Sequence, residues 1–264
     1  MRIPIEILRN RKRIMGIMHI PSKFVGEKTF VVLCYGMNGN RVEANRIFVK
    51  VADYFENKGI AFVRFDYLGL GISDGEFFEA DLDTKVLDVI SVVNYIRNCH
   101  VNEKCRIVLM GISDGAKVIN KIMSENLIEI DDVILLNPVL ALSKSEVEAE
   151  VEENAKKSLG DISVVKHPAL GKMAILNVGQ FFSPKHMKQC SVDQEIFDVT
   201  DKNLICFFSA KDDLSFVTRN MMEKKACEIK EIASHSHIFV EKEAQSVLFE
   251  EAVNWILNLG EEGQ

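Results

Sequence analysis

The chain of 264 residues has no hydrophobic run long enough to cross a bilayer, and its first residues lack the apolar core of a secretory signal peptide. Its six cysteines include no C-x-x-C pair. These absences predict a cytoplasmic protein without membrane contact, whose reduced thiols pack as small hydrophobic groups. The sequence also contains no internal repeat and no low-complexity tract, so we expect one ordered domain.

Clustered positive charge is scarce as well. The formal net charge is -7, and the basic run at residues 9–13 is short and lies between two apolar segments, which is typical of a turn facing water. A surface that follows nucleic-acid phosphates needs clustered lysine and arginine side chains, so nucleic acid is not an expected partner. The hydrophobic content of 47% and charged content of 27% suit a single domain with a large core.

Strand-like and helix-like segments alternate along most of the chain. Runs that are apolar on both faces predict buried parallel strands, and apolar residues at helical spacing predict the helices between them. The first two strands, around the basic run, predict an antiparallel edge hairpin. Together the pattern predicts an α/β domain with a mostly parallel sheet and right-handed crossovers. The predicted strands are 3–8, 13–20, 29–34, 60–66, 105–110, 132–138, 203–208 and 227–232, and the predicted helices are 42–58, 82–98, 116–123, 215–225 and 244–259.

The alternation breaks between residues 140 and 202. This stretch begins with a charged helical segment at 145–159 and continues as a part that we expect to be irregular. A long excursion from an α/β pattern usually lies over the carboxyl ends of the strands, where ligands bind. We therefore interpret 140–202 as a lid inserted within a single domain of residues 1–264. A peripheral decoration without a role in binding is the alternative.

A G-x-S-x-G pentapeptide at residues 111–115 follows a predicted buried strand and precedes a predicted helix. In this context the pattern predicts a nucleophile elbow with Ser113 at the tip of a tight turn. The two glycines suit a strained turn that passes close to the neighbouring strand and helix. Ser113 is therefore the candidate nucleophile.

A serine hydroxyl needs a base to take its proton and a carboxylate to orient that base. A carboxylate follows the penultimate predicted strand, at Asp212 or Asp213. An imidazole follows the last predicted strand, at His237 or His235. These loops and the elbow would open at the same edge of a parallel sheet, so the sequence predicts a Ser-His-Asp triad.

An oxyanion hole needs two donors aimed at the developing negative charge. The backbone N–H of Asp114, directly after the nucleophile, is predicted to be one of them. The other is predicted in the loop after the strand at 29–34, at Met37. This chemistry implies no metal and no organic cofactor.

Three segments carry a family resemblance: the strand and loop at 31–40, the loop at 64–75, which has the pattern FD-x-x-G-x-G-x-S-x-G, and the elbow at 111–115. Together they resemble the α/β-hydrolase superfamily, most closely the branch of cinnamoyl and feruloyl esterases and serine-aminopeptidase-like hydrolases. The resemblance implies an eight-stranded, mostly parallel sheet flanked by helices, with the lid after the sixth strand. By position it implies that Asp212 is the acid and His237 the base of the triad.

Four positions depart from what is usual in that family. Tyr35 stands where histidine is frequent, and its hydroxyl could either reach the site or pack. Asp114 puts a carboxylate beside the nucleophile, which is expected to disfavour anionic substrates there. Ser209 replaces the usual glycine of the acid loop, and Ala116 replaces another frequent glycine, which we expect to be a minor packing difference.

The sequence therefore predicts a serine hydrolase that cleaves a small carboxylic ester through an acyl-enzyme. The alternative within the fold is an acyl thioesterase or acyltransferase acting on acyl-carrier or coenzyme A thioesters, and a non-catalytic fold-mate is the third reading. The expected partner is a small-molecule ester or thioester, and a homodimer stays open. The thioesterase reading would use apolar side chains of the insertion as an acyl tunnel: Leu170, Met173, Ile175, Leu176, Phe181 and Phe182.

Overall fold

The centre of the molecule is an eight-stranded sheet with the strand order β1-β2-β4-β3-β5-β6-β10-β11. The computed structural model describes residues 1–141, 163–177, 179–191, 193–197, 203–225 and 227–262. An antiparallel hairpin of β1 (Arg2–Arg9) and β2 (Lys12–His19) forms one edge of the sheet. The other six strands are parallel, which confirms the predicted sheet: β3 (Lys28–Cys34), β4 (Ala61–Phe65), β5 (Cys105–Ile112), β6 (Asp132–Leu136), β10 (Asn203–Ser209) and β11 (Glu228–Ile232).

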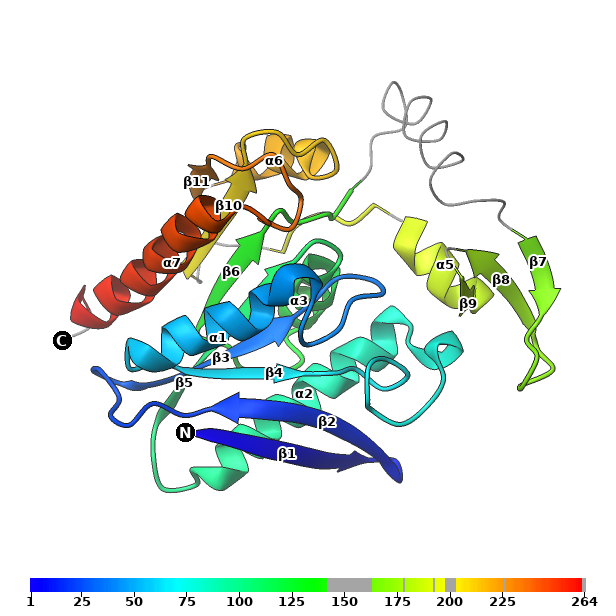
Figure 1. The fold of residues 1–264 in the computed structure, drawn as a ribbon, viewed down its shortest axis with the longest axis horizontal. Helices are drawn as coiled ribbons and strands as arrows, with labels where there is room; N and C mark the ends of the chain where they lie inside the picture. The colour runs from blue at the N-terminus through cyan, green and yellow to red at the C-terminus, as the bar shows by residue number, and fades with distance from the viewer. Residues whose placement is uncertain (142–162, 178, 192, 198–202, 226, 263–264) are drawn as a thin grey trace.

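Helices cover both faces of this sheet (Figure 1). On one face α1 (Ile47–Asn57) packs with α7 (Lys242–Glu262), and on the other α2 (Leu82–Cys99) packs with α3 (Gly115–Ser124). A short helix, α6 (Phe216–Met222), connects β10 to β11. None of the helices in the described part of the chain combines the length and apolar character needed to span a bilayer.

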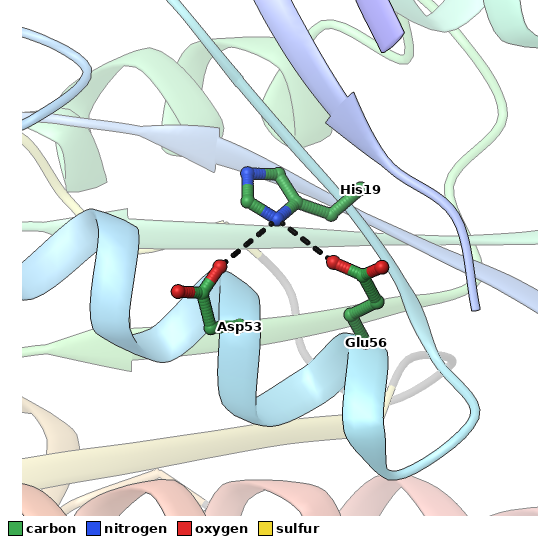
Figure 2. Close-up of side chains that lie close together, drawn as sticks. All are labelled: His19, Asp53 and Glu56. Atoms are coloured by element: carbon green, nitrogen blue, oxygen red, sulfur yellow. Dashed lines mark hydrogen bonds and ion pairs between the residues drawn. The ribbon is translucent and has the colours of Figure 1, made fainter. Parts of the chain in front are cut away.

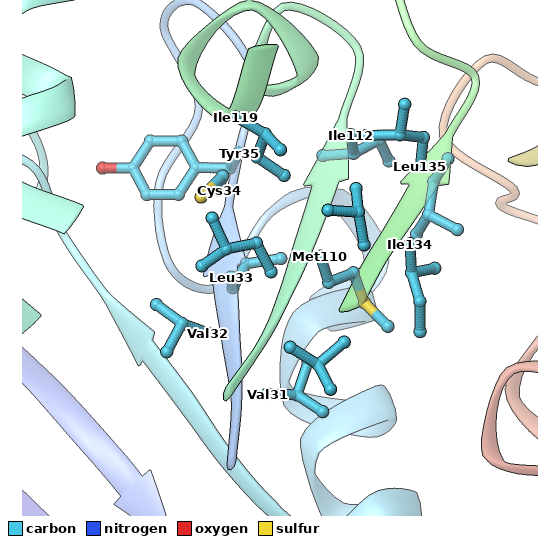
Figure 3. Close-up of a cluster of buried hydrophobic side chains, with 14 of the residues drawn as sticks. Val31, Val32, Leu33, Cys34, Tyr35, Met110, Ile112, Ile119, Ile134 and Leu135 are labelled. Carbon is cyan, nitrogen blue, oxygen red and sulfur yellow. The ribbon is translucent and has the colours of Figure 1, made fainter. Parts of the chain in front are cut away.

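The strands β3, β5 and β6 lie side by side in the middle of the core. Their side chains are buried on both faces of the sheet, as continuous apolar runs predict for central parallel strands. Each such aliphatic side chain contributes about 1.5–3 kcal/mol by burial, so these strands fix the positions of the loops at their carboxyl ends. Figure 3 shows part of this cluster, including Val31, Val32, Leu33, Met110, Ile112, Ile119, Ile134 and Leu135.

The first long helix begins later than its periodicity predicted, at Ile47 rather than at Val42. Asn45 and Arg46 have positive φ angles of 52° and 56°, which no right-handed helix accommodates. The side-chain oxygen of Asn40 accepts the N–H of Val42 at 2.9 Å. A turn anchored by a local side-chain hydrogen bond therefore replaces the predicted first turn of the helix.

The insertion follows β6, and the expectation that its second part is irregular was wrong. Three short strands form a separate antiparallel sheet in the order β7-β8-β9, and a helix follows them. Strands of three to five residues are too short to show a hydrophobic period. The charged helical segment predicted at 145–159 lies outside the described residues. The elements are β7 (Ser163–Lys166), β8 (Met173–Asn177), β9 (Gln180–Phe182) and α5 (Pro184–Ser191).

Candidate active site

Ser113 lies at the turn between β5 and α3, where the pentapeptide predicted a nucleophile elbow. Its φ angle is 56°, a left-handed conformation that is strained for a residue with a side chain. A Cβ atom added at Gly115 would lie 2.1 Å from the carbonyl oxygen of Cys34, and one at Gly111 would lie 2.7 Å from Ile119. Gly115 is therefore required, because any side chain there would meet the backbone of β3, whereas at Gly111 the nearest atom is the end of the Ile119 side chain.

The end of β6 and the segment after it hold the elbow. The N–H of Ser113 donates to the carbonyl of Leu136 at 3.0 Å, and the N–H of Val139 donates to the carbonyl of Ser113 at 3.1 Å. Because the last residue of β6 and a residue just after that strand supply the two partners, the strained serine is fixed from outside its own turn.

His237 and Asp212 form a half-buried pair in the loops after β11 and β10. His237 Nδ1 lies 2.8 Å from Asp212 Oδ2, and the Ser215 hydroxyl donates to the same oxygen. Burial alone would raise the pKa of Asp212, but the hydrogen bonds from His237, Ser215 and the Leu214 backbone outweigh it and lower that pKa.

The neighbouring acid and imidazole that the sequence left open lie elsewhere. Asp213 and His235 are both exposed to solvent. The backbone N–H of His235 donates to Glu241, which turns this part of the loop away from the paired imidazole.

The two ring nitrogens of His237 have different surroundings. Nε2 is buried and has no hydrogen-bond partner among the described residues. Since Nδ1 is bound to a carboxylate, the neutral ring carries its proton there and leaves a lone pair on Nε2. A neutral imidazole in this state is a competent general base.

Asn137, which the sequence analysis did not single out, joins the elements that carry these groups. It is fully buried, with φ at 41°, directly after β6. Its side-chain nitrogen donates to the carbonyl of His237 and to the hydroxyl of Ser209, both at 2.8 Å. The Asn-Pro pair that ends this apolar run was the available signal, since such pairs mark turns.

Ser209, the residue in place of the usual glycine, has a role in the same linkage. Its hydroxyl donates to the carbonyl of Ser236 at 2.7 Å, and its N–H donates to Asn137 Oδ1 at 2.7 Å. The end of β10 and the loop carrying His237 are therefore held together through one buried network.

The loop after β3 approaches the nucleophile closely. A Cβ atom added at Gly36 would lie 3.4 Å from the Cβ of Ser113 and 3.7 Å from its Oγ. Met37 follows, half-buried, and its carbonyl accepts a hydrogen bond from the Lys85 ammonium at 2.8 Å. This loop therefore brings the N–H groups after β3 to the same side of the sheet as the elbow.

Tyr35 packs instead of reaching the nucleophile. Its hydroxyl accepts the N–H of Tyr67 at 2.8 Å, and its ring is fully buried. Figure 3 shows the ring at the border of the apolar cluster with its hydroxyl directed away from the other labelled side chains. Burial raises the pKa of this hydroxyl well above its usual range, so it stays protonated.

The glycine-rich loop after β4 is built around Asp66. The Asp66 carboxylate accepts the N–H of Arg41 at 2.8 Å and the N–H of Ile72 at 3.0 Å, and it also pairs with the Arg41 guanidinium. Gly71 has a positive φ of 54°, and a Cβ there would lie 2.1 Å from that carboxylate. The FD-x-x-G-x-G motif therefore ties the loop after β4 to the loop after β3.

The carboxylate of Asp114 is not an isolated negative charge. Its Oδ2 lies 3.9 Å from the ammonium of Lys85 and its Oδ1 lies 3.7 Å from that of Lys117, and both lysines are almost fully buried. His186 of α5 lines the same small cavity. Burial and the charge of Lys85 lower the pKa of His186 to about 4, so this ring is neutral near pH 7.

The insertion contacts the sheet domain through aromatic rings. The ring of Phe182 is fully buried, with centroids 4.8 Å from Phe77 and 5.0 Å from His186. Met173, by contrast, is 63% exposed. Of the six side chains predicted to form an acyl tunnel, Phe182 is therefore packed against neighbouring rings and Met173 faces solvent.

An open groove of about 390 Å³ runs along the carboxyl edge of the sheet, between the loops after β3 and β4 and the insertion. A volume of this size can admit a small organic molecule. It is lined by Asn38, Gly39, Asn40, Arg41, Gly69, Leu70, Gly71, Ile72, Phe77 and Gln180.

One cluster in the described part of the chain has side chains at metal-ligand spacing, and it lies far from the elbow in sequence. The ligand atoms of His19, Asp53 and Glu56 all lie within 4.8 Å of one another (Figure 2). Arg64 Nε donates to His19 Nε2 at 3.0 Å, so the neutral ring carries its proton on Nδ1, which faces the two carboxylates.

The carboxylates of this cluster are also bound by the cations of Met1 and Arg2 at the start of β1. The terminal ammonium of Met1 pairs with Glu56, and the guanidinium of Arg2 lies 2.8 Å from Asp53. A ring nitrogen that carries a proton cannot ligate a metal ion. We therefore interpret these residues as a charge network that fastens β1 and β2 to α1.

Comparison with known proteins agrees with this architecture. Residues 27–243 match the model of the family described as serine aminopeptidase, S33. A curated protein of Escherichia coli, described as an uncharacterized 31.7 kDa protein in the traX-finO intergenic region, is 35% identical over 85 residues. That match covers 32% of this chain and 29% of the relative, so less than a third of either protein is compared.

Solved structures match over nearly the whole chain. Est1E from Butyrivibrio proteoclasticus, solved with ferulic acid bound, has a TM-score of 0.69 at 17% identity and covers 96% of this chain and 98% of its own. The α/β hydrolase GrgF from Penicillium sp. sh18 has a TM-score of 0.68 at 16% identity, with 96% of each chain covered. Mouse α/β hydrolase domain-containing protein 10 has a TM-score of 0.67 at 16% identity, covering 97% and 99%. At these identities the likeness concerns the fold alone.

Proposed function

The chain belongs to the serine aminopeptidase S33 family of α/β hydrolases, and we propose that it is a serine hydrolase that cleaves a small carboxylic ester. The observation that carries this proposal is the pair of His237 and Asp212, which leaves a buried, unpartnered Nε2 in the loop tied to the elbow. The linkage through Asn137 supports it, because the segment that bonds the elbow also bonds the loop of His237.

In the proposed mechanism, His237 Nε2 takes the hydroxyl proton of Ser113 as Oγ bonds to the ester carbonyl carbon. Asp212 keeps the imidazole in the required tautomer and stabilises its cation. The carbonyl oxygen becomes an oxyanion, which accepts hydrogen bonds from the N–H groups of Met37 and Asp114. The bond to the alkoxy group then breaks, and His237 donates its proton to the departing alcohol.

Hydrolysis of the acyl-enzyme repeats these steps with water as the nucleophile. His237 takes a proton from the water as its oxygen bonds to the acyl carbon. The tetrahedral intermediate then collapses, the bond to Ser113 Oγ breaks, and the proton returns to that oxygen as the carboxylic acid leaves. No step uses a group from outside the chain other than substrate and water.

Two features favour a small ester over a long acyl thioester as substrate. The groove of about 390 Å³ begins at Asn38, next to Met37, and admits a compact molecule, while its lining includes no residue of the proposed triad. Phe182 closes the space between the insertion and Phe77 with its own ring. Among the described residues, the side chains expected to hold a long acyl chain therefore give that alternative little support.

The test is a series of p-nitrophenyl esters of increasing chain length, run beside acyl-coenzyme A thioesters, with a fluorophosphonate probe for the nucleophile. We expect hydrolysis of the acetate and butyrate and a probe adduct on Ser113. Ser113→Ala should abolish both, whereas Ser246→Ala, at a serine on the outer surface of α7, should keep both. Activity confined to long thioesters would change the assignment to a thioesterase. A probe that leaves Ser113 unlabelled would overturn both the esterase and the thioesterase assignment.

A further inference from the structure

Lys85 lies almost fully buried in the first turn of α2, at a position that ordinary helix periodicity assigns to the core. An ammonium group loses much of its hydration there, so its position is unfavourable unless other groups replace the water. Its contacts include the carbonyl of Met37 at 2.8 Å, the carboxylate of Asp114 at 3.9 Å and the ring face of Tyr67, whose centroid is 5.6 Å away.

Two of these contacts are the two residues whose backbone N–H groups form the proposed oxyanion hole. Met37 belongs to the loop after β3, and Asp114 belongs to the elbow after β5. The two loops are distant in sequence, and each is a short turn with glycine beside the residue in question, Gly36 in one and Gly115 in the other. A single ammonium group therefore bridges the two halves of the hole.

We propose that Lys85 is a positioning residue for oxyanion stabilisation, holding Met37 and Asp114 at the spacing that the transition state requires. This inference rests on the proposed function and names a residue that the triad does not include. The N–H of Met37 belongs to the peptide group between Gly36 and Met37. Gly36 has no side chain, so it restricts the rotation of this peptide group little. The hydrogen bond from Lys85 holds the carbonyl of Met37, and in this way it restricts the backbone of the residue from its C-terminal side.

The charge of Lys85 also favours the oxyanion of the transition state. A carboxylate one residue after the nucleophile opposes the negative charge that develops on the substrate oxygen. Lys85 faces one oxygen of Asp114 and Lys117 faces the other, so the pair offsets that carboxylate. The two lysines share this electrostatic role, and the bond to Met37 is what distinguishes the positioning role of Lys85.

The matched variants are Lys85→Met and Lys117→Met. Each removes one nearly buried ammonium group at a similar distance from Asp114, and Lys85→Met also removes the donor to the Met37 carbonyl. We expect Lys85→Met to lower kcat on p-nitrophenyl acetate by about 30- to 100-fold, somewhat less than the loss of a whole oxyanion donor, with KM within about threefold. Lys117→Met should lower kcat by less than about fivefold.

A transition-state analogue gives the readout that a merely structural residue would not change. A trifluoromethyl ketone forms a hemiketal with Ser113 whose oxyanion occupies the same hole. Its inhibition constant should rise in Lys85→Met in proportion to the fall in kcat/KM, and Lys85→Gln, which keeps an N–H donor, should fall between wild type and Lys85→Met. The thermal midpoint of each variant checks the fold, and Lys85→Gln carries the comparison if Lys85→Met does not fold.

The positioning role would be overturned if Lys85→Met and Lys117→Met lowered kcat equally. It would also be overturned if Lys85→Met raised KM and left the inhibition constant unchanged. In either case the wild type would still hydrolyse esters. A wild type that neither hydrolyses any ester nor reacts with fluorophosphonate at Ser113 would instead overturn the proposed function, and the role of Lys85 with it. The two failures therefore give different results in the unmodified protein.

Discussion

His237 Nδ1 lies 2.8 Å from Asp212 Oδ2, and the opposite ring nitrogen of the same histidine is buried without a hydrogen-bond partner in the described part of the chain. The carboxylate fixes which nitrogen carries the proton, and the fold keeps water from satisfying the other. This polarity along one imidazole ring is what the proposed role of His237 as a base requires. His19 is the contrast, since cationic and anionic neighbours occupy both of its nitrogens.

The first prediction concerns the acid. Asp212→Asn should lower kcat on p-nitrophenyl acetate by about 10³- to 10⁴-fold, because the amide stabilises the wrong tautomer of His237 and cannot support its cation. The matched control is Asp213→Asn, at the exposed neighbouring carboxylate, which should stay within about twofold of wild type. A loss in the Asp213 variant as large as that in the Asp212 variant would show that the acid is the exposed residue.

The second prediction concerns acid stability and His186. This ring has a pKa of about 4 in the native protein, against an ordinary value of about 6.5 in the unfolded chain. Between these values the unfolded state binds a proton that the native state does not, so the free energy of unfolding falls as the pH decreases through this window. The loss is at most about 1.4 kcal/mol per pH unit, on the order of 3 kcal/mol in all.

Urea unfolding from pH 7 to pH 4.5 measures this effect. His186→Gln has no such titration, so its stability should decrease less steeply than that of wild type between pH 6.5 and 4.5. His235→Gln, at an exposed histidine, should keep the wild-type slope. If His186→Gln and wild type lose stability in parallel, the buried ring is not the group responsible.

The third prediction concerns Asn137. Asn137→Ala should lower the free energy of unfolding by about 3 kcal/mol or more, since it loses buried hydrogen bonds and must also keep a positive φ. It should also lower kcat by tenfold or more, because the loop of His237 loses its anchor. Urea unfolding and ester hydrolysis measure the two effects.

The matched control for Asn137 is Asn126→Ala. Asn126 has a similar positive φ of 50° but is exposed. Its replacement should cost about 1–2 kcal/mol for the backbone conformation and leave kcat unchanged. Equal effects of the two variants on kcat would mean that the side chain of Asn137 does not hold the loop.

Patterns among residues that are neighbours in the sequence were sufficient to predict much of the fold. Continuous apolar runs identified the central strands, because a strand covered on both faces has no position for a polar side chain. The pentapeptide around Ser113 identified the elbow, since only glycine fits where the turn touches the backbone of Cys34. The short strands of the insertion were missed, because three to five residues are too few to establish a period.

Contacts between distant residues could not be predicted in this way. The sequence by itself determined the sheet, the elbow and the order of the catalytic candidates, because local hydrophobic patterning and turn chemistry encode them. Only the tertiary structure decided which carboxylate faces His237, that Tyr35 packs, and that Lys85 bridges Met37 and Asp114. Those relationships arise where loops from separate strands converge at one edge of the sheet, and a buried charge finds its partners only after the chain has folded.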